Sequence, residues 1–336
     1  MSRRIRYDAW SPGRAATWTS PWCEPGFAFD DLVASWSATT PPGTWIEVAA
    51  QARGRRTQRD ASSLGSSGTS WRVLGRWASG ASAPHRTSVT GDPEVDTDVW
   101  RPGEGVDAYR LRVTRHGSGT VQPDVHRVGA VVSAGRVRTT TSRPLKSTTR
   151  VLDVPRLSQM TWKEVGGDGW CSPTSVAMVL SHAGTLPPTT DTGSVDVARV
   201  AAEVADPAYG AGNWPFNTAW AATLTGHAFV TRLRDLRDAE HFIDAGIPLV
   251  ASVAYPSGAL RGAPTRGTDG HLVVIRGFTA DGRVVTNDPA SPTQRRVRRT
   301  YDRGEFERAW LRGSGGLVYV IHRDDQVLPP GGRAAW

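Results

Sequence analysis

The chain has 336 residues, enough for about two domains of ordinary size, and no apolar run approaches the ~18 residues of a membrane helix. Its 38% hydrophobic and 21% charged residues are close to the composition of an ordinary soluble protein, so a disordered chain is not the expected class. The net charge of +8 lies in residues 1–150, where 21 Lys and Arg face 13 Asp and Glu; residues 151–336 have 19 of each. This charge would attract an anionic polymer, but no nucleic-acid motif accompanies it, so a nucleic-acid partner is disfavoured.

Residues 1–24 are interpreted as an N-terminal tail. Their positive charge is not followed by the apolar segment of a secretory signal, which taken alone predicts a cytoplasmic protein. Two cysteines, Cys23 and Cys171, are too few for a disulfide scaffold or a cysteine-rich zinc site, and the thiol chemistry considered below requires no metal and no organic cofactor. A single disulfide between the two stays open on the sequence.

Residues 25–135 alternate polar and apolar positions between clusters of turn residues, which is the period of β-strands. The pattern recurs in residues 45–52, 71–77, 109–113 and 128–132 without a helical stretch between them, and it predicts a β-sandwich. Eight of the fourteen tryptophans lie in the first 100 residues. Tryptophans fill cores or, where exposed, bind sugar rings and polymer chains, so this region is also a candidate binding module.

Residues 136–150 contain too little apolar surface to be buried and are interpreted as a linker. Helical and strand patterns mix over residues 151–324, and residues 325–336, which contain two prolines and two glycines in a row, are interpreted as a C-terminal tail. The predicted fold class is therefore α+β, with an N-terminal β-sandwich followed by a mixed domain.

The sharpest local signal is a helix between Cys171 and Gly184. Ser172 is a good N-cap, Pro173 suits the first helical position, and Gly184 suits the C-terminal end. Cys171 would lie just before the helix N-terminus, where unpaired amides and the helix dipole lower a thiol pKa from about 8.5 and favour the nucleophilic thiolate. A small buried cysteine under the helix is the alternative, and a second group is needed to decide.

That second group is a histidine with an aspartate downstream. His271 heads an apolar run, and Asp288 ends the next run after an Asp281-Gly282 hairpin signal. Antiparallel pairing would return Asp288 toward His271, where its carboxylate would orient the imidazole and complete a set of nucleophile, base and orienter. A histidine at a strand end and an aspartate in a turn also have ordinary structural roles, and the sequence does not fix the register.

Together these residues resemble the papain-like cysteine peptidases related to bacteriocin-leader-processing (double-glycine) peptidases, in particular their stand-alone bacterial relatives. The resemblance covers about residues 151–322. It rests on five motifs: Val154-Pro155-Arg156-Leu157-Ser158-Gln159, Cys171-Ser172-Pro173-Thr174-Ser175 with Met178, Gly212-Asn213-Trp214-Pro215-Phe216-Asn217, Gly270-His271 and Asn287-Asp288-Pro289.

The resemblance implies a papain-like cysteine peptidase domain over residues 151–324 that hydrolyses peptide or amide bonds. Cys171 matches the nucleophile of the family and His271 its general base. Asp288 matches the residue that orients the histidine, and Gln159 the glutamine that helps to bind the oxyanion. The insert 160–169 is longer than the family pattern, and Ser172 stands where many relatives have glycine.

Trp170, Asn213 and Trp214 are candidate substrate-binding residues. Residues 213–216 would form an aromatic wall of the cleft, or else a structural turn that opens a helix over residues 217–224. The resemblance implies a peptide or amide substrate and favours a secreted or cell-envelope protein, held by its basic sandwich to an anionic or cell-envelope polymer. A catalytically silent papain-like binding protein and a thiol acyltransferase such as a transpeptidase remain open.

Overall fold

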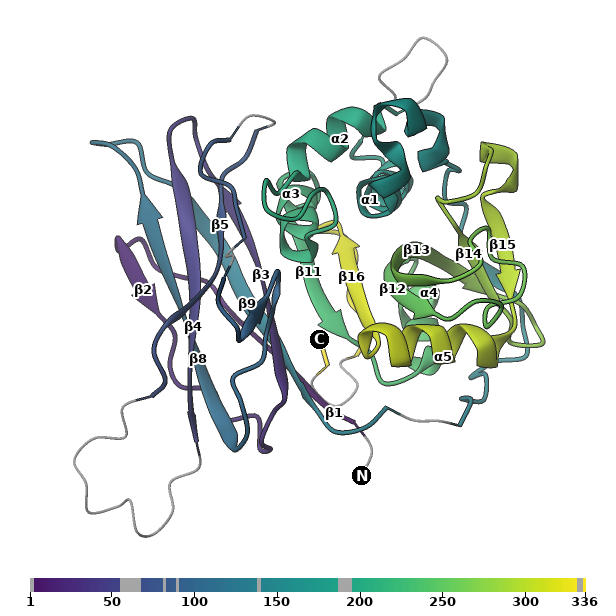
Figure 1. Cartoon of the computed structure of the whole chain (residues 1–336), viewed down its shortest axis with the longest axis horizontal. Coiled ribbons are helices and arrows are strands. Elements are labelled where there is room, and N and C mark those ends of the chain that lie inside the picture. The colour runs from purple at the N-terminus through teal and green to yellow at the C-terminus, as the bar shows by residue number, and fades with distance from the viewer. Residues whose placement is uncertain are drawn as a thin grey trace.

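The computed structural model describes residues 3–54, 68–80, 83–88, 91–137, 140–186, 195–330 and 335–336. Two parts lie side by side in Figure 1: a set of N-terminal antiparallel sheets and a domain of mixed helices and strands. This mixture of helix and strand agrees with the predicted class. Residues 138–139 of the expected linker and residues 331–334 of the expected tail lie outside the described residues.

The N-terminal part contains two antiparallel sheets, ordered β1-β9-β3-β7-β6 and β2-β8-β4-β5. Their strands are β1 (Arg4–Trp10), β2 (Thr17–Thr19), β3 (Asp31–Thr39), β4 (Trp45–Gly54), β5 (Arg72–Trp77), β6 (Val95–Asp96), β7 (Val99–Trp100), β8 (Val106–His116) and β9 (Asp124–Ala134). The two sheets are adjacent layers in Figure 1, and the ring of Trp10 in the first packs 6.4 Å from that of Tyr109 in the second.

Which residues of these strands are buried depends on what packs against each face of the sheet. In β8 buried residues mostly alternate with partly exposed ones, as expected for a strand with one face toward a core. In β3 nearly every residue is buried, because a helix of the second domain covers its other face. Trp36, Trp77 and Trp100 are among the largest fully buried side chains, so part of the tryptophan set fills the core.

The described residues 3–24 of the expected N-terminal tail are not a tail, which corrects the sequence interpretation. β1 pairs with β9, β2 pairs with β8, and Cys23 exchanges backbone hydrogen bonds with Tyr109. The alternation of β1 is short and its arginines obscure it, so the pairing partner, more than one hundred residues away, decides its structure. Both cysteines are free, so no disulfide joins them.

Described residues of the expected linker and of the expected C-terminal tail are also held in place. Ser142 is buried; its N–H donates to the Glu307 carboxylate, and its carbonyl accepts from Arg303. Trp336 packs on the Phe242 ring at 4.8 Å. Specific hydrogen bonds and one terminal aromatic order these segments, and composition alone does not reveal such contacts.

The second domain is built on one sheet, ordered β11-β16-β12-β13-β14-β15, with β10 paired to β13. Its elements are β10 (Arg150–Val151), η2 (Gln159–Val165), η3 (Gly167–Gly169), α1 (Cys171–His182), α2 (Val197–Val204), α3 (Trp214–Thr225), β11 (His227–Arg232), α4 (Leu236–Asp244), β12 (Leu249–Tyr255), β13 (Thr268–Phe278), β14 (Val284–Asn287), η4 (Gln294–Arg296), β15 (Arg298–Tyr301), α5 (Arg303–Ser314) and β16 (Leu317–His322). Helices α1, α2 and α3 lie together in Figure 1, and α5 crosses in front of the sheet.

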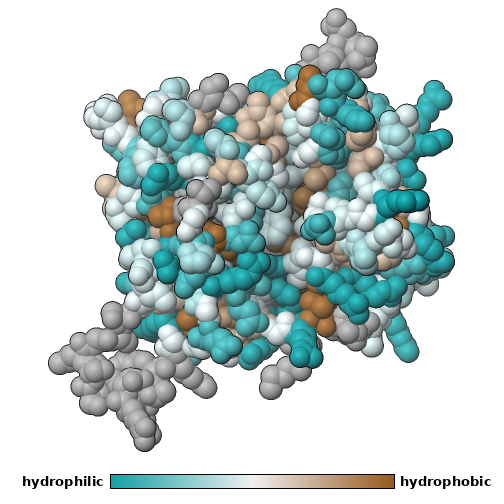
Figure 2. Space-filling view, in the orientation of Figure 1, coloured by the Kyte–Doolittle hydropathy of each residue, from teal (hydrophilic) through white to brown (hydrophobic). Residues whose placement is uncertain are grey.

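The surface of the face shown in Figure 2 is mostly hydrophilic, with smaller hydrophobic groups scattered over it. Among the described residues, none of the helices has the length and apolar character needed to span a membrane.

The two parts share one hydrophobic core. Phe216 of α3 lies between Trp36 of β3 and Trp77 of β5, with ring centroids 6.1 and 5.5 Å apart. The buried Arg86 side chain crosses the boundary and donates to three backbone carbonyls at the C-terminal end of α2. These contacts fix the N-terminal part against α2 and α3.

Candidate active site

Cys171 is the first residue of α1, which begins two residues earlier than predicted. The N-cap is Trp170, so the expected Ser172 cap is wrong; the Ser172 hydroxyl instead lies 2.9 Å from the Tyr319 hydroxyl of β16. Gly184 follows the helix with φ of 72°, as the sequence predicts. The backbone N–H of Cys171 belongs to the first turn, whose amides have no acceptor within the helix.

His271 and Asp288 are brought together by the hairpin of β13 and β14. The register pairs Val274 with Asn287, so Asp288 emerges from β14 beside the start of β13. Nε2 of His271 lies 2.8 Å from Oδ1 of Asp288, and both residues are buried. The contact that the sequence left open is therefore present.

A third residue completes the environment of Asp288. The Tyr301 hydroxyl of β15 donates to Oδ2 of Asp288 at 2.8 Å, and the backbone N–H of Ala290 donates to Oδ1. Burial raises the pKa of the Asp288 carboxyl, but the charge and hydrogen bond of His271 and these donors bring it below its ordinary value. Sequence reasoning missed Tyr301, because only the pairing of β15 with β14 places it here.

The His271 imidazole also acts on the Cys171 thiol, whose pKa it lowers. Since Nε2 contacts Asp288, the ring nitrogen that remains for sulfur is Nδ1. Burial lowers the pKa of the His271 imidazole, but Asp288 and Cys171 raise it to about 10. Burial also raises the pKa of the Cys171 thiol, yet the hydrogen bond and charge of His271 bring it below its ordinary value. Both directions favour a thiolate paired with an imidazolium.

Gln159 begins η2 and is buried close to this pair in the fold. Its backbone N–H donates to the carbonyl of Pro289, directly after Asp288, at 2.9 Å. Its Nε2 donates to the carbonyl of Asp168, three residues before Cys171, at 2.6 Å. Gln159 thus bonds to both the segment that follows Asp288 and the segment that precedes Cys171.

The long insert 160–169 folds compactly into η2 and η3, which explains how Gln159 returns toward the cysteine despite the spacing. Gly166 turns the chain between them with φ of 96°, a conformation that favours glycine. At Gly167 a Cβ atom would lie 2.6 Å from backbone atoms of Gln159 and Trp162. The two glycines therefore allow the insert to close on itself.

Two family models match the chain. The Peptidase_C39 like family matches residues 151–317, and the Peptidase C39 N-terminal domain matches residues 4–133. The chain is a C39-family peptidase-like protein. No curated protein matches it. The second match begins at β1, in agreement with the paired strands found where the sequence suggested a tail.

In this C39-family protein the three candidate substrate-binding residues differ in position. Asn213 is the N-cap of α3: its Oδ1 accepts from the Phe216 N–H, its Nδ2 donates to Asp206, and the residue is 1% exposed. A capping asparagine with both polar groups used in this way fits the structural-turn interpretation. Trp170 and Trp214 are partly buried, at the starts of α1 and α3.

The described residues contain no group of three or more His, Cys, Asp and Glu that could hold a metal ion. The chemistry that this C39-family site offers from its own side chains is that of a thiol nucleophile with an adjacent acid-base group.

Proposed function

We propose that this C39-family protein is a cysteine hydrolase of peptide or amide bonds. The observation that carries the proposal is the position of His271, whose Nε2 lies 2.8 Å from Asp288 and whose imidazole lowers the pKa of the Cys171 thiol. A nucleophile, a base and an orienting carboxylate in this order activate a thiol. A cysteine at a helix start facing a histidine strand supports a papain-like fold for residues 151–324, and the two layered sheets support a β-sandwich before it.

The proposed reaction uses groups of the chain and water. The Cys171 thiolate attacks the carbonyl carbon, and the carbonyl oxygen becomes an oxyanion that the Cys171 N–H and the second amide hydrogen of Gln159 stabilise. The carbon–nitrogen bond breaks as the His271 imidazolium gives its proton to the leaving amine, which leaves a thioester. Water then attacks the thioester while His271 takes its proton, and the acid product and the thiolate separate.

Trp170 and Trp214 are proposed to contact the substrate, since both retain exposed surface at the starts of the two helices near the site. Asn213 is omitted from this set, because its side chain is buried and both of its polar groups are used.

The test is the pH dependence of iodoacetamide alkylation of the full chain, followed at each cysteine by mass spectrometry. We expect Cys171 to react with an apparent pKa below the ordinary ~8.5 of a thiol, and His271→Ala to raise that pKa by about one unit or more. Cys23 is the internal control, because burial and its hydrogen bond to Asp8 raise its pKa to about 12. An ordinary thiol pKa at Cys171 in the folded protein would favour the catalytically silent alternative.

We also propose that the outer face of the β2-β8-β4-β5 sheet holds an anionic, cell-envelope type of polymer. Arg110 lies over the rings of Trp22 and Trp71 at 4.6 and 5.2 Å. Arg112 lies 4.4 Å from the Trp71 ring and Arg53 4.5 Å from the Trp22 ring. Guanidinium groups stacked on flat rings form a preorganised cationic surface.

This surface predicts that the double variant Arg110→Gln/Arg112→Gln elutes from a heparin column at lower salt than the wild type, because two fixed cations are lost. The matched variant Arg261→Gln/Arg266→Gln removes two exposed arginines of the second domain. Equal shifts for the two variants would show a general charge effect and contradict a polymer site on this sheet.

A further inference from the structure

A cavity of about 540 Å³ lies at the boundary between the two parts of the molecule. Its lining includes none of Cys171, His271, Asp288 and Gln159. Among the described residues that line it are five arginines and one carboxylate, that of Asp31. Arg3, Arg101 and Arg136 come from the N-terminal part, and Arg232 and Arg312 come from the second domain.

Arg232 is the deepest of these cations. It ends β11 and is 4% exposed, and its Nη1 donates to the carbonyl of Ser314 at the end of α5. Its Nε lies 3.4 Å from Oδ1 of Asp31 but outside hydrogen-bond geometry, and it has no hydrogen-bond partner among the described residues. A buried donor in this state is costly, since it has lost water without gaining an acceptor.

Arg3 lies beside Arg232. Its Nη2 donates to Asp31 at 3.2 Å and to Ser133 at 2.6 Å. The guanidinium lies directly against Gly315, where a Cβ atom would come within 2.5 Å of it. Burial and the charge of Arg232 lower the pKa of Arg3 to about 10. Two guanidinium groups are thus held close together with one carboxylate between them.

The remaining acidic neighbours are engaged elsewhere. Asp96 pairs with Arg101 at 3.3 Å, Asp30 accepts from the Gly135 N–H, and Asp98, which interacts electrostatically with Arg232, accepts from the Trp214 N–H. Arg136 and Arg312 are exposed and have no ion-pair partner among the described residues. The cavity therefore offers two unpaired guanidinium groups and the open Nε of Arg232.

Capping of α5 explains only part of this cluster. Arg232 bonds to the last turn of that helix, as a cation near a helix C-terminus often does. Arg136 and Arg312 make no such contact with a backbone carbonyl among the described residues, so helix capping does not account for the two arginines at the cavity mouth.

We propose that this cavity binds an organic phosphate, with the phosphoryl group on Arg136, Arg232 and Arg312 and the organic part on Trp214. Guanidinium groups match phosphate oxygens in paired hydrogen bonds, and a phosphate monoester brings nearly two negative charges where a carboxylate brings one. The volume lies in the range of small-molecule sites, well above that of a bare phosphate. The site shares Trp214 with the proposed substrate contacts but contains none of the proposed catalytic residues, and it does not rest on the hydrolase proposal.

The test is isothermal titration calorimetry on the full chain, in EDTA and at constant ionic strength, with ADP, inorganic pyrophosphate and citrate. We expect saturable binding of ADP and pyrophosphate, tighter for ADP, and at least tenfold weaker binding of citrate. The variant Arg136→Gln/Arg312→Gln should weaken pyrophosphate binding by about tenfold or more, because charge-assisted hydrogen bonds are lost, while the unfolding midpoint without ligand stays unchanged.

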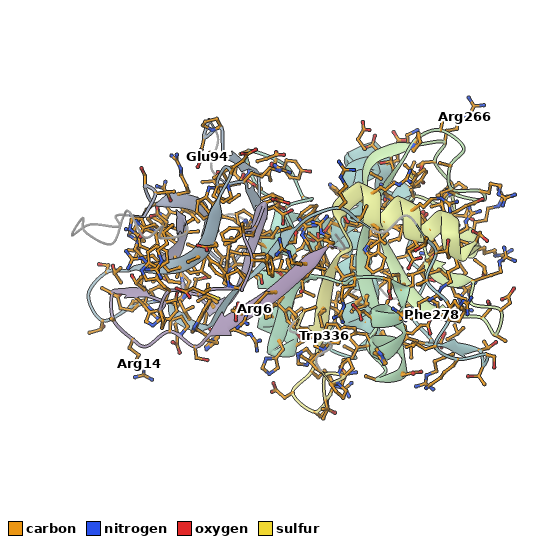
Figure 3. The ribbon with its side chains drawn as sticks, turned by 90° about the horizontal axis from the view of Figure 1, so that it is seen from below. Arg6, Arg14, Glu94, Arg266, Phe278 and Trp336 are labelled. Atoms are coloured by element: carbon orange, nitrogen blue, oxygen red, sulfur yellow. The ribbon has the colours of Figure 1, made fainter. Side chains whose placement is uncertain are left out.

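The control variant Arg14→Gln/Arg266→Gln removes the same charge from two side chains that point outward at opposite ends of the molecule in Figure 3, and it should leave the affinity unchanged. Absence of saturable pyrophosphate binding would overturn the proposal, as would equal losses in the two double variants. Equal affinity for pyrophosphate and ADP would overturn the organic part of the assignment.

Discussion

At the residue scale, the hydrogen bonds that the Asp288 carboxylate accepts keep it ionised in the proposed site. Its buried carboxylate accepts from His271, Tyr301 and the Ala290 N–H, so its negative charge is well satisfied without water. That charge supports the imidazolium form of His271, which in turn supports the Cys171 thiolate. Removal of any one of these donors should therefore change the pKa of the Cys171 thiol.

Tyr301→Phe tests this chain of contacts while it keeps the ring. Loss of the hydroxyl should raise the pKa of Asp288 and leave its carboxylate free to turn away from His271. The pKa of His271 should then fall and that of the Cys171 thiol rise, with a loss of about 1.5–3 kcal/mol in unfolding free energy. Alkylation of Cys171 against pH and urea unfolding measure the two effects. Tyr255→Phe is the control, because its hydroxyl bonds Thr265 and not Asp288. An unchanged alkylation profile in Tyr301→Phe would show that Asp288 acts without it.

The side chains of the candidate triad could be found from sequence because each lies at a marked end of an element. Cys171 stands at a helix start, and the Asp281-Gly282 turn returns Asp288 toward His271. Tyr301 carries no such mark, since its position depends on a strand pairing made across a loop. Asn213 could belong to the cleft or to a turn that opens a helix, because a capping asparagine and a binding asparagine look alike in sequence.

At the element scale, the insert between Gln159 and Cys171 depends on how tightly η2 and η3 pack. Gly167→Ala would place a Cβ atom 2.6 Å from fixed backbone atoms, so we expect a loss of about 1–3 kcal/mol and displacement of Gln159. Gly169→Ala is the matched control, because a Cβ atom there meets nothing within 4 Å. Urea unfolding and the Cys171 alkylation rate of both variants measure the difference.

Equal behaviour of the two alanine variants would mean that the insert relaxes at no cost and does not fix Gln159. The sequence marked these glycines only as part of a long insert. Their separate roles depend on the returning backbone of η2, which no local pattern describes. A contact outside any local pattern also explains why Ser172 is not the predicted N-cap. Its hydroxyl bonds to the hydroxyl of Tyr319, which is distant in the sequence.

At the scale of the whole molecule, the sequence suggested two parts joined by a linker, and the structure joins them through one core. The alternation of polar and apolar residues predicted the strands of the first part, and mixed helical and strand patterns predicted the character of the second. These patterns did not predict the boundary, where Phe216 packs between Trp36 and Trp77 and Arg86 caps α2. Such contacts pair residues more than one hundred positions apart, so no local window contains them. We therefore regard the molecule as one cooperative unit.

Asp98 makes this boundary sensitive to pH. It is buried, and its Oδ2 accepts from the Trp214 N–H at the start of α3. Burial, aided by the charge of Asp96, raises the pKa of Asp98 from 3.8 to about 7. Between these values the folded protein keeps a proton that the unfolded chain has released. The unfolding free energy therefore falls as pH rises through this window, by up to about 4 kcal/mol for three pKa units.

Asp98→Asn removes this titration while an amide oxygen still accepts from Trp214. We expect the variant to unfold at a higher temperature than the wild type at pH 8, and the difference to shrink toward pH 5, in calorimetric scans of the full chain. Asp124→Asn, which changes an exposed carboxylate of the same part, should leave the pH dependence as it is. Because Asp98 lies where the two parts meet, the shift should move a single transition of the whole molecule. Separate transitions, or the same pH dependence in Asp98→Asn and wild type, would contradict this coupling.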